Sequence, residues 1–281
     1  LAELQRFRYV GPLRVVPGRY STQLSVLDDG RWADGSAAWD FIFQHFNGRT
    51  GRGDEVVRYI SSVMSREESA GEIGLGLGYG IDVVETRLIE TGGAFFKRLQ
   101  AMSLNALDIE ERDLLDLIHS DFMQAPARYR IVLVDPQGMA LSAHDVGVGV
   151  AQVVPVVVAA VAPHANTIAV EQPELHIHPA IQVALGDLFI QHARQDDKVF
   201  LLETHSEHIV LRLLRRIRET ASGELTNPDL ALTPEDVAFL YLTADPKGLK
   251  VTELPVDIEG EFLVRWPNKK GFFGERLDEV G

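Results

Sequence analysis

The sequence predicts an α/β protein built around a parallel β-sheet with crossover helices, and three observations lead to this fold class. Short apolar runs rich in β-branched residues predict strands at Arg130–Asp135, Thr167–Glu171 and Lys198–Glu203. Helical patterns separate these strands, and the clearest is the amphipathic segment Pro179–Ala193, which begins with proline. The strands are apolar throughout instead of alternating, as is typical of strands buried on both faces. Alternation of such strands with helices indicates a parallel sheet.

The composition is that of an ordinary globular protein. The chain has 281 residues, of which 46% are hydrophobic, and this length suggests about two domains. There is no cysteine, which excludes disulfides, thiolate nucleophiles and cysteine-based metal sites and fits a cytoplasmic protein. The 27 basic and 41 acidic residues give a net charge of −14, which disfavours a surface that is basic throughout.

The patterns in residues 1–125 are mixed. Helical periodicity predicts helices over Ala37–Phe46 and Asp54–Met64. The glycine-rich run Gly71–Gly80 predicts a loop, and the acidic and apolar residues of Ile109–Phe122 predict a further helix.

The apolar segment Val146–Pro163 has two possible interpretations. Its length is near the limit for a bilayer crossing, so a membrane span is one of them. It contains Gln152, Pro155 and glycines, however, and neither flank carries Lys or Arg to anchor it among lipid headgroups. A wholly buried helix of a soluble α/β domain explains the segment better, and we expect no membrane contact.

The chain changes in character towards its C-terminus. Ser206 is a plausible N-cap for a helix that reaches Thr220. The segments Val237–Thr243 and Leu249–Leu254 flank the turn DPKG and predict a hairpin. A boundary near Gly223 would leave a small α+β element at the end of the chain.

The first segment that carries chemistry is the glycine loop Asp145–Gln152, which opens the apolar helix. Free N–H groups and the positive dipole end of a helix attract phosphate oxygens. Gly147 and Gly149 allow close backbone approach, and Gln152 adds an amide. The alternative is that these glycines only let the helix pack tightly on the sheet.

The second segment follows the strand Thr167–Glu171 and reads EQPELHIHP. Carboxylates such as Glu171 and Glu174 at the end of a buried strand can hold Mg²⁺ beside a phosphate. A purely structural role would require a cationic partner, because buried carboxylates without one are costly.

The third segment, Glu203-Thr204-His205-Ser206, ends the next strand. His205 could donate a hydrogen bond to a phosphate or to an attacking water. The alternative is a histidine whose hydrogen bonds are satisfied locally.

The order and spacing of the three segments resemble the C-terminal half of an ABC-type ATPase head of the P-loop NTPase fold. The sequence is most similar to predicted bacterial AAA-family ATPases of the RecF/OLD/SMC-like group that carry a small C-terminal domain of unknown function. The resemblance is strong over 128–221, fair over 237–281 and thin over 21–125. It rests on the motifs VEQPELHIHPAIQ, ETHSEHIVLRLLRRI, WPNKKGFFGERLDE and YVGPLRVVPGRY.

The resemblance implies a role for each matching position. Glu171 stands where the metal-orienting acid stands, and Gln172 where the catalytic glutamate stands. His178 falls in the D-loop, and His205 matches the switch histidine that senses the γ-phosphate. The signature loop, which caps the γ-phosphate bound by the other subunit, comprises Asp145, Gly147, Gly149 and Gln152.

The resemblance also implies domains, cofactors and partners. An N-terminal-lobe or insertion region would occupy 1–125, the ATPase core 126–222 and the small C-terminal domain 223–281. ATP and Mg²⁺ would bind between two subunits of a homodimer and act as a conformational switch. A process similar to DNA repair or anti-phage defence follows from the resemblance alone.

The sequence departs from the family pattern in three ways. The signature loop lacks a serine, and Gln172 cannot take a proton at neutral pH, which leaves Glu174, two residues on, as the candidate substitute. No G-x-x-x-x-G-K-[ST] motif exists in the 281 residues. Since the chain starts at Leu1, we expect that a nucleotide-binding N-terminal segment is missing, and that this chain alone is inactive as an ATP hydrolase.

Two other functions compete with this interpretation. A nucleotide-gated scaffold that binds a nuclease or DNA partner and hydrolyses little would suit Gln172. A metallohydrolase would instead draw its ligands from Glu171, Glu174, His176, His178, His205 and His208.

The chain contains local clusters of basic residues, the kind of surface that could bind DNA. We interpret them as solvated helix faces or phosphate-sensing arginines more readily than as a DNA track. They comprise Arg6, Arg8, Arg14 and Arg19 near the start, and Arg212, Arg215, Arg216 and Arg218 after the histidine motif.

Overall fold

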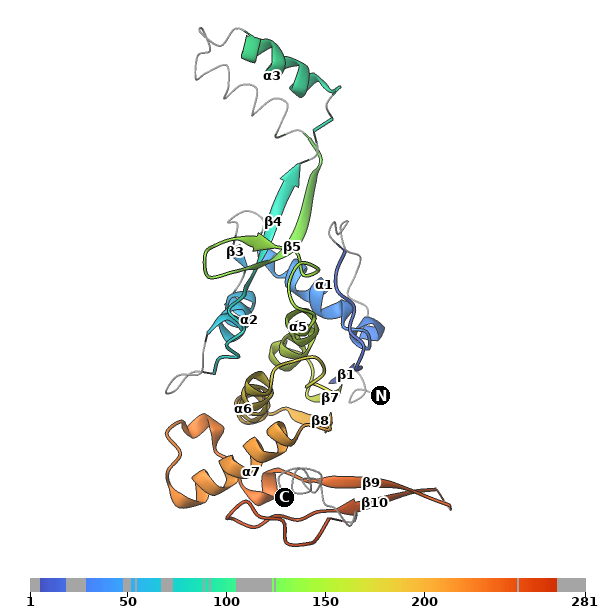
Figure 1. Ribbon diagram of the computed structural model, residues 1–281, viewed down its shortest axis with the longest axis vertical. Coiled ribbons are helices and arrows are strands. Elements are labelled where there is room, and N and C mark those ends of the chain that lie inside the picture. The colour runs from blue at the N-terminus through green and yellow to red at the C-terminus, as the bar shows by residue number, and fades with distance from the viewer. Residues whose placement is uncertain are drawn as a thin grey trace, which may run out of the picture.

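The computed structural model has a layered centre with one extension at each end (Figure 1). An antiparallel ribbon of β4 and β5 leads to α3 at one end, and the hairpin of β9 and β10 lies at the other. The expected helix Ile109–Phe122 and the tail after Trp266 fall outside the described residues. The structure describes residues 6–18, 29–47, 52–53, 55–66, 73–87, 89–90, 92–104, 123, 125–246 and 248–266.

The parallel sheet has the strand order β1-β7-β8. Strands β7 (Thr167–Glu171) and β8 (Val199–Glu203) lie where the sequence predicts them, and α6 (Pro179–Gln195) crosses between them. The third strand is β1 (Phe7–Val10), which pairs in parallel with β7 and which the sequence analysis did not identify. The predicted α/β class, with a parallel sheet and flanking helices, is confirmed.

The placement of the strand predicted at Arg130–Asp135 in this parallel sheet is wrong. Strand β5 (Ala127–Val134) pairs antiparallel with β4 (Gly80–Arg87) and β6 (Ala140–Leu141) in a separate sheet. The turn that follows β5 accounts for its antiparallel pairing with β6. The Asp135 carboxylate accepts the N–H groups of Gln137 and Met139 at 2.9 and 2.8 Å, which reverses the chain beside the strand it has just left.

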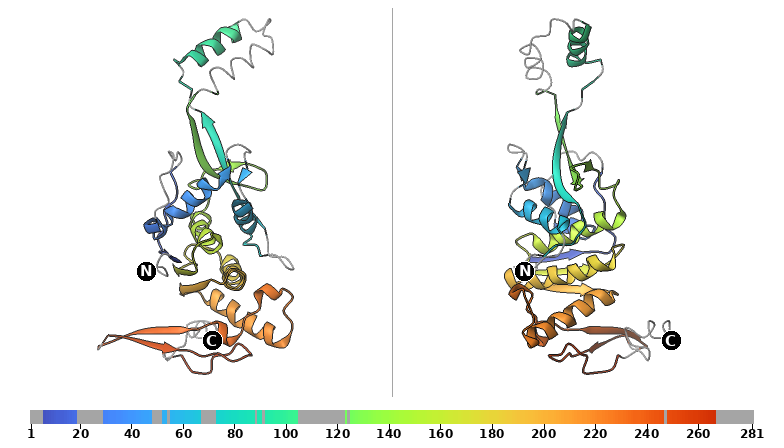
Figure 2. Two further views of the ribbon diagram at one scale, coloured as in Figure 1. Left: turned by 180° about the vertical axis from the view of Figure 1, so that it is seen from behind. Right: turned by 60° about the vertical axis from the view of Figure 1, so that its left-hand side comes forward.

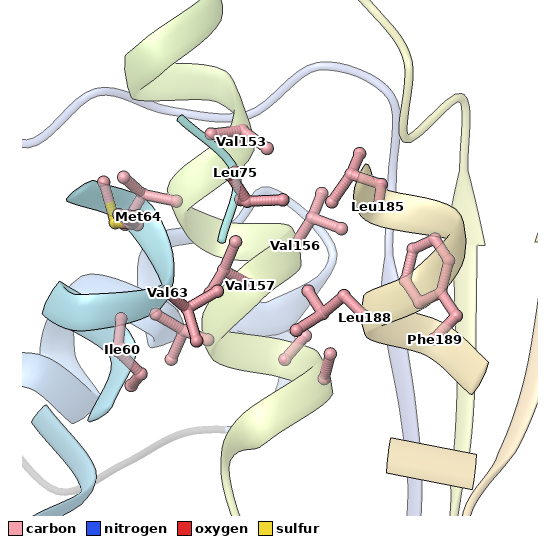
Figure 3. Packing of buried hydrophobic residues seen from close by; sticks show 14 of the residues in the cluster. Ile60, Val63, Met64, Leu75, Val153, Val156, Val157, Leu185, Leu188 and Phe189 are labelled. Carbon is pink, nitrogen blue, oxygen red and sulfur yellow. The ribbon is translucent and has the colours of Figure 1, made fainter. Parts of the chain in front are cut away.

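The helix α5 (Val148–Val161) lies at the centre of the core, and every residue from 151 to 160 is buried. Helices α1 (Ser36–Gln44) and α2 (Glu55–Ser65) pack against it, as does α6. Figure 3 shows side chains of α5, such as Val156, between those of α2 and those of α6, such as Leu188. The predicted buried helix is confirmed. No helix in the described part of the chain is long and apolar enough to cross a membrane.

Cationic side chains bind the C-terminal end of α5. The Arg8 guanidinium donates to the carbonyl oxygens of Ala159 and Ala162 at 2.8 and 3.2 Å. The Lys198 ammonium donates to Ala160 O at 2.7 Å. The last carbonyls of a helix have no partner within the helix, and its C-terminus carries partial negative charge. Arg8 and Lys198 therefore satisfy these carbonyls inside the core.

Helix α7 (Glu207–Ser222) begins at the predicted N-cap, because the Ser206 hydroxyl accepts the Ile209 N–H at 3.1 Å. Two of its arginines are buried against α6. Arg212 Nε and Arg216 Nε each donate to Asp187 Oδ1 at 2.9 Å. The interpretation of Arg212 and Arg216 as solvated or phosphate-sensing is therefore wrong. Their partner lies on another helix, which the local pattern does not reveal.

The predicted hairpin is confirmed, with the strands β9 (Leu240–Asp245) and β10 (Gly248–Glu253). The remaining elements are short or lie at the periphery of the core. Two strands from residues 1–125, β1 and β4, pair with strands from residues 126–222. The other elements are β2 (Phe46–Asn47), β3 (Arg52–Gly53), α3 (Ala94–Leu104) and the 3-10 helices Asp29–Trp32, Pro228–Leu230 and Pro234–Asp236. Figure 2 shows α6 and α7 following the parallel sheet, with the hairpin beyond them.

We expect Asp187→Asn to destabilise the protein by about 3–5 kcal/mol, because it replaces with a neutral amide the buried carboxylate that accepts hydrogen bonds from both Arg212 and Arg216. The matched control is Arg215→Gln, which removes an exposed guanidinium from its i,i+4 ion pair with Glu219 while Arg216 still pairs with Glu219, and it should cost about 1 kcal/mol or less. Chemical denaturation measures both free energies of unfolding. Equal losses in the two variants would refute the assignment of Asp187 as the buried counter-ion.

The buried His192 should make stability depend on pH. Burial lowers the pKa of His192, although a hydrogen bond with Asp196 acts in the opposite direction. Below about pH 6.5, His192 therefore binds a proton in the unfolded chain but not in the folded chain. The free energy of unfolding consequently decreases as the pH is lowered. Denaturation at several pH values should show this fall in the wild type and a smaller one in His192→Gln. A variant of the exposed His144, His144→Gln, should keep the wild-type dependence.

Candidate functional site

The two carboxylates Glu171 and Glu203 lie at the C-terminal ends of β7 and β8 and are register partners. The Gln172 N–H donates to Glu203 O at 2.8 Å. His205 Nε2 lies 3.6 Å from Glu203 Oε1, and these side chains are 75% and 54% exposed. Because parallel strands end at the same edge, the structure brings Glu171, Gln172 and His205 together there, as expected from the topology.

The Glu171 carboxylate is oriented by a tyrosine that the sequence analysis missed. The Tyr9 hydroxyl, on the neighbouring strand β1, donates to Glu171 Oε1 at 2.8 Å. This hydrogen bond raises the pKa of Tyr9, with further contributions from burial and from the charge of Glu171. Tyr9 therefore stays a protonated donor, and Glu171 has a fixed direction at the sheet edge.

The turn after Glu171 has a strained backbone. Gln172 has a φ of 45° and His176 a φ of 63°, both in the left-handed region that L-residues seldom adopt. Local hydrogen bonds close the turn, from Leu175 N–H to Gln172 O at 3.1 Å and from Ile177 N–H to Glu174 O at 3.2 Å. Such strain persists only where the surroundings hold it, and it is concentrated at functional sites.

Glu174 connects this turn to the segment that carries His205. Its Oε2 accepts the Thr204 hydroxyl at 2.8 Å, and its Oε1 accepts the His205 N–H at 2.7 Å. Both oxygens of Glu174 are therefore engaged in holding the segment after β8. A role as substitute base would have to compete with these two hydrogen bonds.

His178 caps the next helix. Its Nδ1 accepts the Ala180 N–H at 3.2 Å at the N-terminus of α6, and its side chain is exposed. Two further hydrogen bonds join this region to the start of α7. Gln182 Nε2 donates to Ile177 O at 2.9 Å, and the Ser206 hydroxyl donates to Gln182 Oε1 at 2.6 Å.

The glycine loop reaches the same region through α5. Gly149 lies against the turn, and a Cβ at this position would clash with the carbonyl oxygen of His176. Close packing, the alternative interpretation of the glycines, therefore applies to Gly149. Gly147 differs, since a Cβ there would meet nothing within 4 Å. It is the N-cap of α5, with no side-chain cap, and it is exposed together with Val148, while Asp145 donates its N–H to Ser142 O at 2.8 Å.

Gln152 does not point to solvent. It is buried, its Oε1 accepts the Arg14 N–H at 3.2 Å, and its Nε2 donates to Arg14 O at 2.6 Å. The Arg14 side chain continues to the turn and donates to Glu171 O and Gln172 O at 2.6 and 3.1 Å. The interpretation of Arg14 as a solvated or phosphate-sensing arginine is therefore wrong, because its buried guanidinium binds backbone carbonyls of the site. The motif YVGPLR contains Arg14, but the sequence of the motif does not show which residues Arg14 contacts.

The donor chemistry at the edge suits a hard cation better than a zinc centre. Within the described ranges, no three His, Asp or Glu side chains converge into a possible metal site, so the ligand set of a metallohydrolase is not assembled there. Glu171 and Glu203 offer carboxylate oxygens on adjacent strands. Oxygen ligands of this kind, completed by water and phosphate, fit Mg²⁺.

Comparison with known proteins gives one family match. Residues 82–210 match the model of an AAA ATPase domain, a range that includes Asp145–Gln152, Glu171 and His205. This confirms, for that part of the chain, the resemblance to AAA-family ATPases. Among solved structures, the chain is similar to an SMC head bound to the C-winged helix domain of ScpA, at 10% identity and a TM-score of 0.40. That match covers 74% of this chain and 44% of the other, so the chain spans less than half of its length. No curated protein matches.

We expect Gly149→Ala to destabilise the chain by about 1–3 kcal/mol, because the added methyl group must displace the backbone of the turn at His176. Gly147→Ala is the matched control two residues away, and in open space it should change stability by less than about 1 kcal/mol. Thermal unfolding of the two variants measures the difference. A wild-type melting temperature for Gly149→Ala would mean that α5 does not pack on the turn.

Proposed function

From the AAA ATPase domain match over residues 82–210, we propose that this chain supplies part of an ABC-type ATP site. ATP and Mg²⁺ would bind between two subunits and act as a conformational switch. The sequence resemblance to RecF/OLD/SMC-like ATPases suggests a process similar to DNA repair or anti-phage defence.

The observation that carries this proposal is the meeting of three segments within the matched range. The ends of β7 and β8 present Glu171 and His205 at one edge, and the first turn of α5 packs against the turn between them at His176. Carboxylates beside an uncapped helix start combine ligands for a cation with donors for phosphate.

Each residue of the edge has a proposed task. Glu171, oriented by Tyr9, would hold Mg²⁺ directly or through water. His205 is exposed and could donate to a γ-phosphate, while Glu174 fixes the position of its backbone. The Mg²⁺ ion would supply charge neutralisation for the phosphates. Gln172 has no proton-accepting carboxylate, so we propose slow hydrolysis.

The start of α5 would act on a nucleotide held by a second subunit. Gly147 and Val148 are exposed, and no side chain caps the helix there. Val150 N–H already donates to Gly147 O at 3.0 Å, so we propose that an anion approaching from outside the chain would meet the N–H groups that precede it. A two-fold symmetric dimer would place each α5 start over the nucleotide of its partner.

A phosphate-binding loop would have to complete this site, because the 281 residues contain no Walker A motif. One face of the parallel sheet supports the proposal that further polypeptide packs here. Phe7 and Tyr9 of β1 and Val199 and Leu201 of β8 are exposed on this face, next to the carboxylates. Parallel sheets are almost always covered on both faces.

A second candidate function is a nucleotide-gated scaffold for a nuclease or DNA partner that hydrolyses little or no ATP. Two observations favour it over an efficient hydrolase. Gln172 cannot act as a base, and both oxygens of Glu174 already accept hydrogen bonds.

The experiment compares ATP affinity and phosphate release in a protein that contains these residues together with a phosphate-binding loop. We expect Glu171→Gln to weaken Mg²⁺-ATP binding or to lower turnover at least about tenfold, because it removes a charged oxygen ligand. His205→Ala should lower turnover with less effect on binding. The 281-residue chain alone should bind ATP weakly and not hydrolyse it.

The control is Glu235→Gln, which removes an exposed carboxylate outside the site and should leave both measurements unchanged. Tight ATP binding by the 281-residue chain, or unchanged turnover in both site variants, would overturn the proposal. Normal ATP binding without phosphate release in the wild type would favour the scaffold.

A further inference from the structure

Arg14 contacts both α5 and the turn that follows β7 in the candidate site. It follows β1 in the chain and is 4% exposed. Towards α5, its backbone exchanges two hydrogen bonds with the Gln152 amide, and its Nη1 donates to Gln152 O at 3.4 Å. Towards the turn, its Nη2 donates to the carbonyl oxygens of Glu171 and Gln172.

We propose that Arg14 is a positioning residue that couples the first turns of α5 to the backbone at Glu171 and Gln172. The proposal deepens the proposed function, since it makes Arg14 the connection between the helix that would meet a partner's nucleotide and the residues that would hold Mg²⁺. A movement of α5 would thus reach the metal-binding edge through one buried side chain.

The turn depends on this contact because its conformation is strained. Gln172 adopts a φ of 45°, which a non-glycine residue holds only when its surroundings fix it. Arg14 Nη2 donates to the carbonyl oxygen that precedes Gln172, at 2.6 Å on Glu171, and to the carbonyl oxygen of Gln172 itself, at 3.1 Å. Two adjacent peptide planes are therefore fixed by one guanidinium group.

An arginine suits this position better than a lysine would. The guanidinium is a planar fork that donates in several fixed directions, whereas an ammonium is a compact point charge on a flexible stem. Burial lowers the pKa of Arg14 to about 10, so the group keeps its charge at neutral pH. A lysine at position 14 would contact either the turn after β7 or the Gln152 carbonyl of α5, but not both.

Arg8 provides a matched control within the same segment. It is also a buried arginine that donates to backbone carbonyls of α5, but at Ala159 and Ala162 near the opposite end of the helix. Arg8→Lys therefore removes the same kind of interaction from the same helix. The turn after β7 receives no hydrogen bond from the Arg8 contacts at Ala159 and Ala162, so we expect it to be unchanged.

The first experiment uses hydrogen–deuterium exchange on the 281-residue chain and needs no ATP. In Arg14→Lys, the amides of Leu175 and Ile177, which close the turn, should exchange about tenfold faster while amides in the middle of α6 keep their protection. In Arg8→Lys, faster exchange should appear at Ala162 N–H instead. Unchanged exchange at Leu175 and Ile177 in Arg14→Lys overturns the proposal.

The second experiment uses the ATP-hydrolysing protein with its phosphate-binding loop. Arg14→Lys should lower kcat about tenfold with KM for ATP within about twofold, and Arg8→Lys should leave both near wild type. A loss of kcat that is equal in both variants would indicate a general structural role and overturn the coupling. If the wild type neither binds nor hydrolyses ATP, the proposed function fails, and the exchange experiment still decides the role of Arg14 in the turn.

A second variant covers the case in which Arg14→Lys does not fold. Gln152→Leu keeps Arg14 but removes both side-chain hydrogen bonds to its backbone. We expect the same pattern, with faster exchange at Leu175 and Ile177 and a lower kcat. The double variant should lose no more activity than Arg14→Lys alone, because the two residues act in one pathway. Independent, multiplicative losses would overturn the coupling.

Discussion

The burial of α5 is the constraint on which the rest of the structure depends. A helix whose residues 151–160 are all buried satisfies its own interior peptide groups, but its end carbonyls need partners that water cannot supply. Arg8 and Lys198 meet this need at the C-terminus. Because Arg8 lies on β1 and Lys198 directly precedes β8, the same contacts bring both edge strands of the parallel sheet under the helix.

The two ends of α5 are therefore chemically different. Its C-terminus is closed by cations, whereas its N-terminus has no side-chain cap and rests on the turn after β7 through Gly149. The sheet edge, the strained turn and the helix start consequently form one unit, connected by Arg14 and Glu174.

The sequence predicted what local pattern determines and missed what distant partners determine. Strands β7 and β8, the Ser206 cap and the buried helix follow from apolar runs and capping chemistry within a few residues. Tyr9, Arg14 and Asp187 gain their meaning from partners far along the chain or on another helix, which periodicity does not report. The direction of β5 failed for a related reason. An apolar run predicts a strand but does not identify its neighbours, and β5 pairs with β4, a segment far earlier in the chain.

The charge at the sheet edge limits what can bind there. Glu171, Glu174 and Glu203 gather at the ends of two strands in a chain with a net charge of −14, and such an edge repels phosphate. The buried guanidinium of Arg14 donates to the backbone carbonyls of Glu171 and Gln172. In the proposed function, a divalent cation has to accompany the nucleotide, and the remaining positive potential has to come from the phosphate-binding loop and from the helix start of a second subunit. Metal dependence and dimerisation are then two consequences of the same excess of carboxylates.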